Sequence, residues 1–124
     1  MHELTIARNI IQIVENELKK KGNSAKVKKV SFKAGALNAI IPESLVFGFD
    51  ILKKDSELLR DSELIVEEIP LKVKCRACGT ESVLDGPFFF CSNCGSGDVE
   101  VVEGEEMFVE SVELYEPEEE SYGD

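Results

Sequence analysis

Residues 75–95 read CRACGTESVLDGPFFFCSNCG and contain all four cysteines of the chain. The cysteines form two pairs, Cys75 with Cys78 and Cys91 with Cys94, and a glycine follows the second cysteine of each pair. Two residues between paired cysteines let both thiolates point at one ion, and the glycine lets the backbone turn away without the steric cost of a Cβ atom. The spacing therefore predicts a tetrahedral site with four cysteine ligands.

Four thiolates suit zinc, whose structural sites are tetrahedral and coordinatively closed. Two disulfides are an alternative that a reducing cytosol disfavours, and a thiolate-bound iron site would need a redox role that nothing else in the sequence supports. We therefore expect zinc with a structural role, because a closed site offers no position for substrate or water. Such a metal contributes on the order of 10 kcal/mol, enough to fold a segment of about 25 residues that could not bury a core alone.

The sequence before the cysteines predicts two helices and two strands. Apolar residues at spacings of three and four predict an amphipathic helix over residues 3–21. Alternating apolar residues predict a strand over residues 26–34, and Pro42 is well placed for the first turn of a second helix. Residues 64–69 fit a second strand, which Pro70 stops.

The sequence after the cysteines predicts two further strands, at residues 99–103 and 107–114. Gly104-Glu105 lies between them, so we expect a tight hairpin. The tail from residue 116 to residue 124 carries five acidic residues and no apolar pattern, and we expect it to be disordered. We identify no internal repeat.

Together these elements predict a small α+β fold, with about two helices packed on a three- to four-stranded sheet and an inserted zinc-ribbon domain with four cysteine ligands. We assign residues 1–70 and 99–124 to an α/β domain and residues 71–98 to the inserted domain.

Composition restricts the partners of this chain of 124 residues. Its formal charge of −11 repels nucleic acid and anionic membranes at long range. No apolar run approaches the roughly 20 residues needed to span a bilayer, and the N-terminus lacks the features of a signal peptide. We expect a soluble cytoplasmic protein that binds neither nucleic acid nor membranes.

Basic charge is concentrated in residues 19–33, which hold seven of the fourteen basic residues. The simpler interpretation is a solvated helix end and strand edge. A docking patch for an acidic protein surface is the alternative.

His2 is the only histidine. The simplest interpretation of a lone histidine at this position is a frayed terminal residue. However, a free α-amine, the amide nitrogen of residue 2 and the imidazole can close adjoining chelate rings around one ion, and the Glu3 amide supplies a fourth nitrogen. Ni(II) and Cu(II), unlike zinc, prefer square-planar nitrogen coordination. Because protons compete for each donor, such a site empties in mild acid, which suits metal carriage better than catalysis.

Several motifs along the chain match one known family. They are Met1-His2-Glu3 opening a helix, Gly35-x-Leu37 at a strand end, Pro42-Glu43-x-Leu45 starting a second helix, Cys75-x2-Cys78-Gly79, Cys91-x2-Cys94-Gly95, and Gly104-x-Glu106 before the last strand. From Met1 to about Glu116, this combination resembles the HypA/HybF hydrogenase nickel-insertion proteins.

The resemblance implies a nickel metallochaperone, not an enzyme, with a nickel-binding α/β domain and an inserted zinc domain. It would help deliver Ni(II) to the large subunit of a [NiFe] hydrogenase, working with a GTPase accessory protein. In some organisms similar proteins also serve urease maturation. No catalytic residue is expected.

The resemblance also assigns the metal ligands. His2, with the Met1 amine and the local amides, would bind nickel as transient cargo, and Glu3 would affect binding or partner contact. Some relatives recruit a second histidine near the zinc domain. This chain has none, so its N-terminal group would hold nickel alone, or with oxygen donors or water. The structural zinc would be held by Cys75, Cys78, Cys91 and Cys94.

Two other classes of function are alternatives. The first is a zinc-ribbon module for protein interaction or transcription, in which His2 is incidental. The second is a hydrolytic metalloenzyme, which is disfavoured because the sequence lacks an open metal site with a positioned base.

Overall fold

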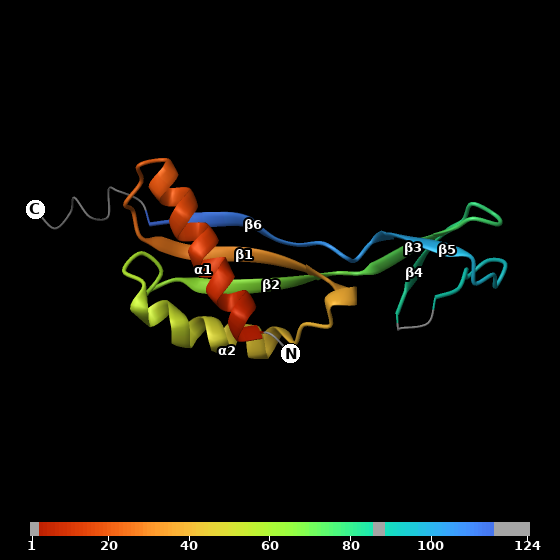
Figure 1. Ribbon diagram of the computed structural model, residues 1–124, viewed down its shortest axis with the longest axis horizontal. Helices are drawn as coiled ribbons and strands as arrows, with labels where there is room; N and C mark the ends of the chain where they lie inside the picture. The colour runs from red at the N-terminus through yellow and green to blue at the C-terminus, as the bar shows by residue number, and fades with distance from the viewer. Residues whose placement is uncertain (1–2, 86–88, 116–124) are drawn as a thin grey trace, which may run out of the picture. The chain divides into compact units, whose positions relative to one another are not determined.

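The computed structural model describes residues 3–85 and 89–115, which form two α-helices and two three-stranded sheets (Figure 1). This confirms the predicted α+β class. Met1, His2 and the acidic tail from residue 116 lie outside the described residues, so the expected disorder of the tail stays a prediction. Among the described residues, no helix combines the length and the apolar composition that a membrane span requires.

Helix α1 spans Glu3–Lys20, as the spacing of its apolar residues predicts. An acidic residue, Glu3, lies in its first turn and two basic residues, Lys19 and Lys20, lie in its last turn, so the side-chain charges complement the helix dipole. One face of the helix is buried, through Ala7, Ile10, Ile11, Val14 and Leu18.

Helix α2 spans Pro42–Leu52 and begins at its proline, where the missing N–H costs no helical hydrogen bond. Leu45 and Phe49 are fully buried. They contribute to the same apolar core as α1, which also contains Leu59 and Leu64.

The first sheet has the strand order β2-β1-β6, with β1 (Val27–Gly35) between β2 (Glu63–Ile69) and β6 (Met107–Leu114) (Figure 1). The central strand alternates as predicted, because Val30, Phe32 and Ala34 are buried and the residues between them are half-buried.

The second sheet has the order β4-β3-β5 and contains β3 (Leu71–Cys75), β4 (Glu81–Leu84) and β5 (Val99–Glu103). Both neighbours of β3 run antiparallel to it. Its apolar core is small: Leu71, Val73 and Leu84 form a buried cluster, and the half-buried Ala36, Val99 and Val101 pack against them.

The chain divides into two compact units. The second unit comprises Lys33–Ile40 and Glu67–Phe108, and the rest of the described chain belongs to the first. The second unit is wider than the insertion expected at residues 71–98, because β5 pairs with β3.

The predicted hairpin between residues 99–103 and 107–114 is wrong. β5 joins β3 in the second sheet, whereas β6 joins β1 in the first. The chain does not fold back at Gly104, because the intervening residues pair with the end of β1 instead. The Leu37 N–H donates to the Gly104 carbonyl at 3.0 Å, and the Gly35 N–H donates to the Glu106 carbonyl at 2.6 Å.

These two segments, which the sequence analysis singled out as the motifs Gly35-x-Leu37 and Gly104-x-Glu106, lie in backbone contact within the second unit. A Cβ atom at Gly35 would lie 2.1 Å from the Gly104 carbonyl oxygen. The Asn38 side-chain amide adds a hydrogen bond of 3.1 Å to the Glu105 carbonyl. Gly35 is therefore required by the close approach of two backbones.

The lysine-rich segment at residues 19–33 is largely engaged with acidic side chains. Lys26 lies 3.9 Å from Asp61, and Lys33 lies 3.0 Å from Glu67. Lys21 and Lys28 form two further pairs, with Glu17 and Glu113 respectively. Such exposed pairs contribute little stability, but they balance the positive charge locally. The contacts favour the interpretation of a solvated surface over that of a docking patch.

The contact between Gly35 and Gly104 predicts the effect of a single added methyl group. Gly35→Ala should lower the free energy of unfolding by about 2 kcal/mol or more, because one of two backbone segments must shift. Gly97→Ala is the matched control, since a Cβ atom there would meet no atom within 4 Å. Urea denaturation followed by circular dichroism measures both, and equal stabilities for the two variants would contradict the assigned contact.

Candidate metal centre

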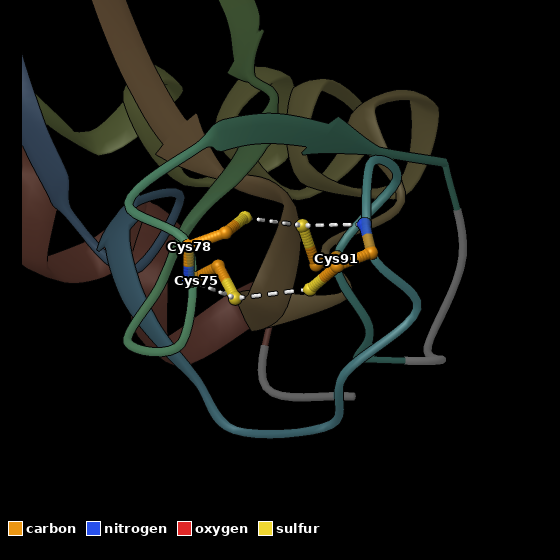
Figure 2. A group of neighbouring side chains, drawn as sticks. Cys75, Cys78 and Cys91 are labelled. Atoms are coloured by element: carbon orange, nitrogen blue, oxygen red, sulfur yellow. Dashed lines mark hydrogen bonds between the residues drawn. The ribbon is translucent and has the colours of Figure 1, made fainter.

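The two cysteine pairs, which are separated by twelve residues in the sequence, lie close together in the second unit. Their sulfur atoms all lie within 4.8 Å of one another. Cys75 Sγ is 3.6 Å from Cys94 Sγ, and Cys78 Sγ is 3.6 Å from Cys91 Sγ. Figure 2 shows the side chains of the labelled Cys75, Cys78 and Cys91 converging from two loops. The predicted convergence of the four cysteines is therefore present.

Each cysteine pair lies in a tight turn, and the two turns have the same hydrogen bonds. In the first knuckle, residues 75–80, Cys75 Sγ accepts the N–H groups of Ala77 at 3.3 Å and Cys78 at 3.4 Å. In the second knuckle, residues 91–96, Cys91 Sγ accepts the N–H groups two and three positions later at the same distances. Backbone donors of this kind stabilise a sulfur in its thiolate form.

The glycine of each knuckle has a left-handed backbone, with φ of +80° at Gly79 and +78° at Gly95. Each glycine N–H donates over 2.9 Å to the carbonyl of the first cysteine in its turn, Cys75 or Cys91. This conformation is strained for a residue with a Cβ atom, which explains why glycine follows each cysteine pair.

The similarity of the knuckles extends one residue beyond the glycine, a feature that was not predicted from the sequence. The Cys75 N–H donates to the Thr80 carbonyl at 2.9 Å, and the Cys91 N–H donates to the Ser96 carbonyl at 2.8 Å. The shared pattern is Cys-x2-Cys-Gly followed by threonine or serine. The chain therefore contains a short internal repeat of six residues, too brief for a search at the scale of whole domains.

The arrangement of sulfurs fits a tetrahedral metal ion and does not fit disulfides. Zinc–sulfur bonds of about 2.3 Å in a tetrahedron place the sulfurs about 3.8 Å apart, close to the two spacings of 3.6 Å. A disulfide needs about 2.05 Å between its sulfurs, and all four cysteines are free. Four thiolates in this geometry suit zinc or iron.

Burial and hydrogen bonding distinguish the four sulfurs. Cys75 and Cys91 are buried, whereas Cys78 and Cys94 are exposed. Hydrogen bonds from the Thr80 hydroxyl and backbone, followed by the Asn93 amide, lower the pKa of Cys78 to about 6. For Cys94, a hydrogen bond from the Ser96 backbone lowers the pKa, but the Cys75 thiol, desolvation and the Cys78 and Cys91 thiols together raise the pKa to about 11.

Three side chains around the cysteines were not predicted from the sequence. Asn93 Nδ2 lies 3.8 Å from Cys78 Sγ and 3.5 Å from Thr80 Oγ1, so it connects the two knuckles. The hydroxyls of Ser82 and Ser92 lie 2.8 Å apart, and the Ser92 N–H also donates to Ser82 Oγ. These contacts join the second knuckle to the first knuckle and to β4. No spacing rule identifies them, because each joins residues at least ten positions apart.

The predicted nickel ligands are only partly within the described residues. Met1 and His2 lie outside them. Glu3 is the first residue of α1, and its Oε2 atom accepts the Ile41 N–H, just before α2, at 3.5 Å. Glu3 therefore connects the start of α1 to the start of α2 within the first unit.

Comparison with known proteins gives a consistent result over almost the whole chain. A family model described as hydrogenase/urease nickel incorporation, metallochaperone, hypA matches residues 1–114. The hydrogenase maturation factor HypA of Desulfatibacillum aliphaticivorans is 40% identical over 119 residues, covering 96% of this chain and 91% of that protein. The protein of the same name from Trichormus variabilis is 41% identical over 116 residues, covering 94% of this chain and 97% of that protein.

Solved structures share the fold. The solution structure of the Ni metallochaperone HypA from Helicobacter pylori aligns with a TM-score of 0.65 at 24% identity, covering 92% of this chain and 97% of that chain. A second solution structure, of a HypA protein, gives a TM-score of 0.68 at 23% identity, covering 93% and 97% of the two chains. At this identity the likeness establishes the fold.

The repeated knuckle predicts equal costs for two substitutions. Gly79→Ala and Gly95→Ala should each lower the free energy of unfolding by about 1 kcal/mol, because the left-handed backbone is strained for alanine. Neither added Cβ would meet an atom within 4 Å, so backbone strain is the only cost. Urea denaturation of the metal-loaded chain measures both. A large cost at one glycine and none at the other would contradict the equivalence of the two turns.

Proposed function

This chain belongs to the HypA family of hydrogenase and urease nickel-incorporation metallochaperones, and we propose that it carries nickel for the maturation of a [NiFe] hydrogenase. The observation that carries this proposal is the family match over residues 1–114, with curated relatives that are named hydrogenase maturation factors and are about 40% identical. The activity is carriage and transfer of a metal ion, so the protein acts as a metallochaperone and not as an enzyme.

Nickel is the cargo, and its proposed site is the N-terminal group. The Met1 amine, the His2 amide and imidazole, and the Glu3 amide supply four nitrogen donors, which suit the square-planar geometry of Ni(II). The Glu3 carboxylate, which accepts the Ile41 N–H, is proposed to hold the first turn of α1 in place beside these donors. Since protons compete for the imidazole, whose ordinary pKa is about 6.5, we expect nickel to be released in mild acid.

Zinc is the proposed resident metal of the second unit, held by Cys75, Cys78, Cys91 and Cys94. The sulfur spacing fits its tetrahedral geometry, and the knuckle N–H groups stabilise the thiolates that it needs. When bound, zinc would crosslink the two knuckles. Four protein ligands leave no open position, which is why the cargo is assigned to a different site.

This assignment gives each unit one metal: the first unit is proposed to bind nickel and the second to bind zinc. The proposed partners are the large subunit of a [NiFe] hydrogenase, which receives the nickel, and a GTPase accessory protein. Proteins of urease maturation are further proposed partners, since the family description includes urease. We propose a cytoplasmic location, where these partners are matured. A zinc-ribbon module for protein interaction or transcription has no separate observation in its favour.

The N-terminal site predicts that nickel binding depends on what precedes Met1. Untagged protein should bind one nickel ion per chain, with no sulfur-to-nickel charge-transfer absorption. His2→Ala, or a Gly-Ser extension before Met1, should lower the affinity at least tenfold, because each removes or displaces a donor. The control is the same Gly-Ser extension at the C-terminus. Calorimetric titration measures the affinities, and unchanged affinity in His2→Ala, or sulfur charge-transfer bands, would overturn the assignment.

The zinc site predicts one tightly bound zinc per chain after purification. Cys91→Ser should lower the zinc content strongly and destabilise the second unit, because it removes a buried ligand. Asn23→Ser, in the first unit and far in sequence from the cysteines, is the control and should retain zinc. Elemental analysis measures both. Full zinc content in Cys91→Ser, or iron in place of zinc in the unsubstituted chain, would contradict the proposal.

A further inference from the structure

The two knuckles have the same backbone hydrogen bonds, but the side chains around their exposed sulfurs differ. Cys75 and Cys91 are 2% and 1% exposed, so a reagent in solvent cannot reach their sulfurs. Cys78 and Cys94 are the exposed members of the cluster. Any chemistry between the site and a dissolved reagent must therefore begin at one of these two residues.

Cys78 has two side-chain hydrogen-bond partners. The Thr80 hydroxyl oxygen lies 3.2 Å from its Sγ atom, and the Asn93 amide nitrogen, from the opposite knuckle, lies 3.8 Å from it. With sulfur as a thiolate, both groups act as donors, and they withdraw electron density from it.

Cys94 lacks both partners among the described residues. In the second knuckle, Ser96 occupies the position equivalent to Thr80 of the first, but its hydroxyl accepts the Asp98 N–H at 3.1 Å. In the first knuckle, Ala77 occupies the position equivalent to Asn93 of the second, and its methyl group cannot donate a hydrogen bond. The side-chain partner of Cys94 Sγ is another sulfur, Cys75 Sγ, at 3.6 Å.

We propose that Cys94 is the reactive sulfur of the four-cysteine site, the one that a soft electrophile modifies first and through which the site opens. The inference rests on the proposed zinc site, in which all four sulfurs are thiolates. Among thiolates, nucleophilicity falls as hydrogen bonding stabilises the charge, so the sulfur without side-chain donors attacks fastest. Hydrogen bonds from neighbouring residues tune metal ligands in the same way.

The reaction with an alkylating electrophile is a simple displacement. An electron pair of Cys94 Sγ forms a bond to the methylene carbon of iodoacetamide, the carbon–iodine bond breaks, and iodide leaves with that bonding pair. No oxidant or reductant is needed. The product is a neutral thioether, which is a weaker zinc ligand than a thiolate, so three strong ligands remain and the bound metal becomes accessible to a chelator.

The test is competitive alkylation of the full zinc-loaded chain with substoichiometric iodoacetamide. Peptide mass spectrometry measures the label on each cysteine, and a chromogenic chelator measures released zinc. Label on Cys94 should exceed label on Cys78 by about threefold or more, because Cys94 lacks the two side-chain donors that stabilise the Cys78 thiolate. Zinc release should follow the label on Cys94.

Matched variants exchange the environments of the two sulfurs. Thr80→Val and Asn93→Ala each remove a partner of Cys78, so the label on Cys78 should rise about threefold. Ala77→Asn places an amide at the position equivalent to Asn93, and the label on Cys94 should fall. Ser96→Ala is the control, because its hydroxyl contacts Asp98 and not Cys94, so the distribution should not change.

The outcomes separate this inference from the zinc site on which it rests. Zinc content is measured first, and a chain that holds no zinc overturns the proposed zinc site itself. A zinc-loaded chain with equal label on Cys78 and Cys94 overturns the inference and leaves the zinc site intact. An unchanged distribution of label in zinc-loaded Thr80→Val also overturns the inference. If Thr80→Val or Asn93→Ala loses zinc, the label is measured in zinc-loaded Ala77→Asn, and an unchanged distribution there overturns the inference.

Discussion

Four sulfur atoms within 4.8 Å of one another are the constraint on which the second unit depends. The buried apolar cluster of its sheet, Leu71, Val73 and Leu84, is too small to balance the conformational entropy of two knuckles and three strands. The proposed zinc crosslink between the knuckles would supply what the core lacks. The first unit has no such need, because α1, α2 and the first sheet contribute most of the buried side chains.

Both helices and four of the six described strands could be predicted from the sequence because their signals are local, whereas β3 and β4, in and beside the cysteine segment, were not predicted. The 3.6-residue periodicity of α1, the position of Pro42 and the alternation in β1 each lie within the element that they define. The strands that pair with β5 and β6 could not be predicted, because a glycine between two strands indicates a hairpin whether or not the two strands pair with each other. Here the partners of Gly104 and Glu106 are Leu37 and Gly35, which lie 67 and 71 residues earlier, and no local signal identifies that contact.

In the candidate metal site, too, some residues could be predicted from the sequence and others could not. The four cysteines follow from their spacing, because metal-ligand geometry restricts the number of residues between two ligands in one turn. Asn93 and Ser82 could not be identified from spacing, because their contacts depend on how the two cysteine segments meet. A comparison of the two knuckles residue by residue does reveal their shared final hydroxyl residue. It also shows alanine opposite asparagine, the difference that makes the site asymmetric.

The two proposed metal sites have opposite requirements, and their donor types meet them. Cargo must leave, so nitrogen donors that compete with protons and lie at the end of the chain are suitable for nickel. A resident crosslink must stay, so four thiolates stabilised by backbone N–H groups are suitable for zinc. Backbone N–H groups donate to the buried sulfurs of Cys75 and Cys91 in the same pattern in both knuckles, and the Thr80 and Ser96 backbones donate to the exposed sulfurs, so the exposed sulfurs differ in their side-chain donors. Retention of the proposed zinc would therefore be limited by the exposed sulfur with the fewest side-chain donors, and not by the average strength of the four ligands.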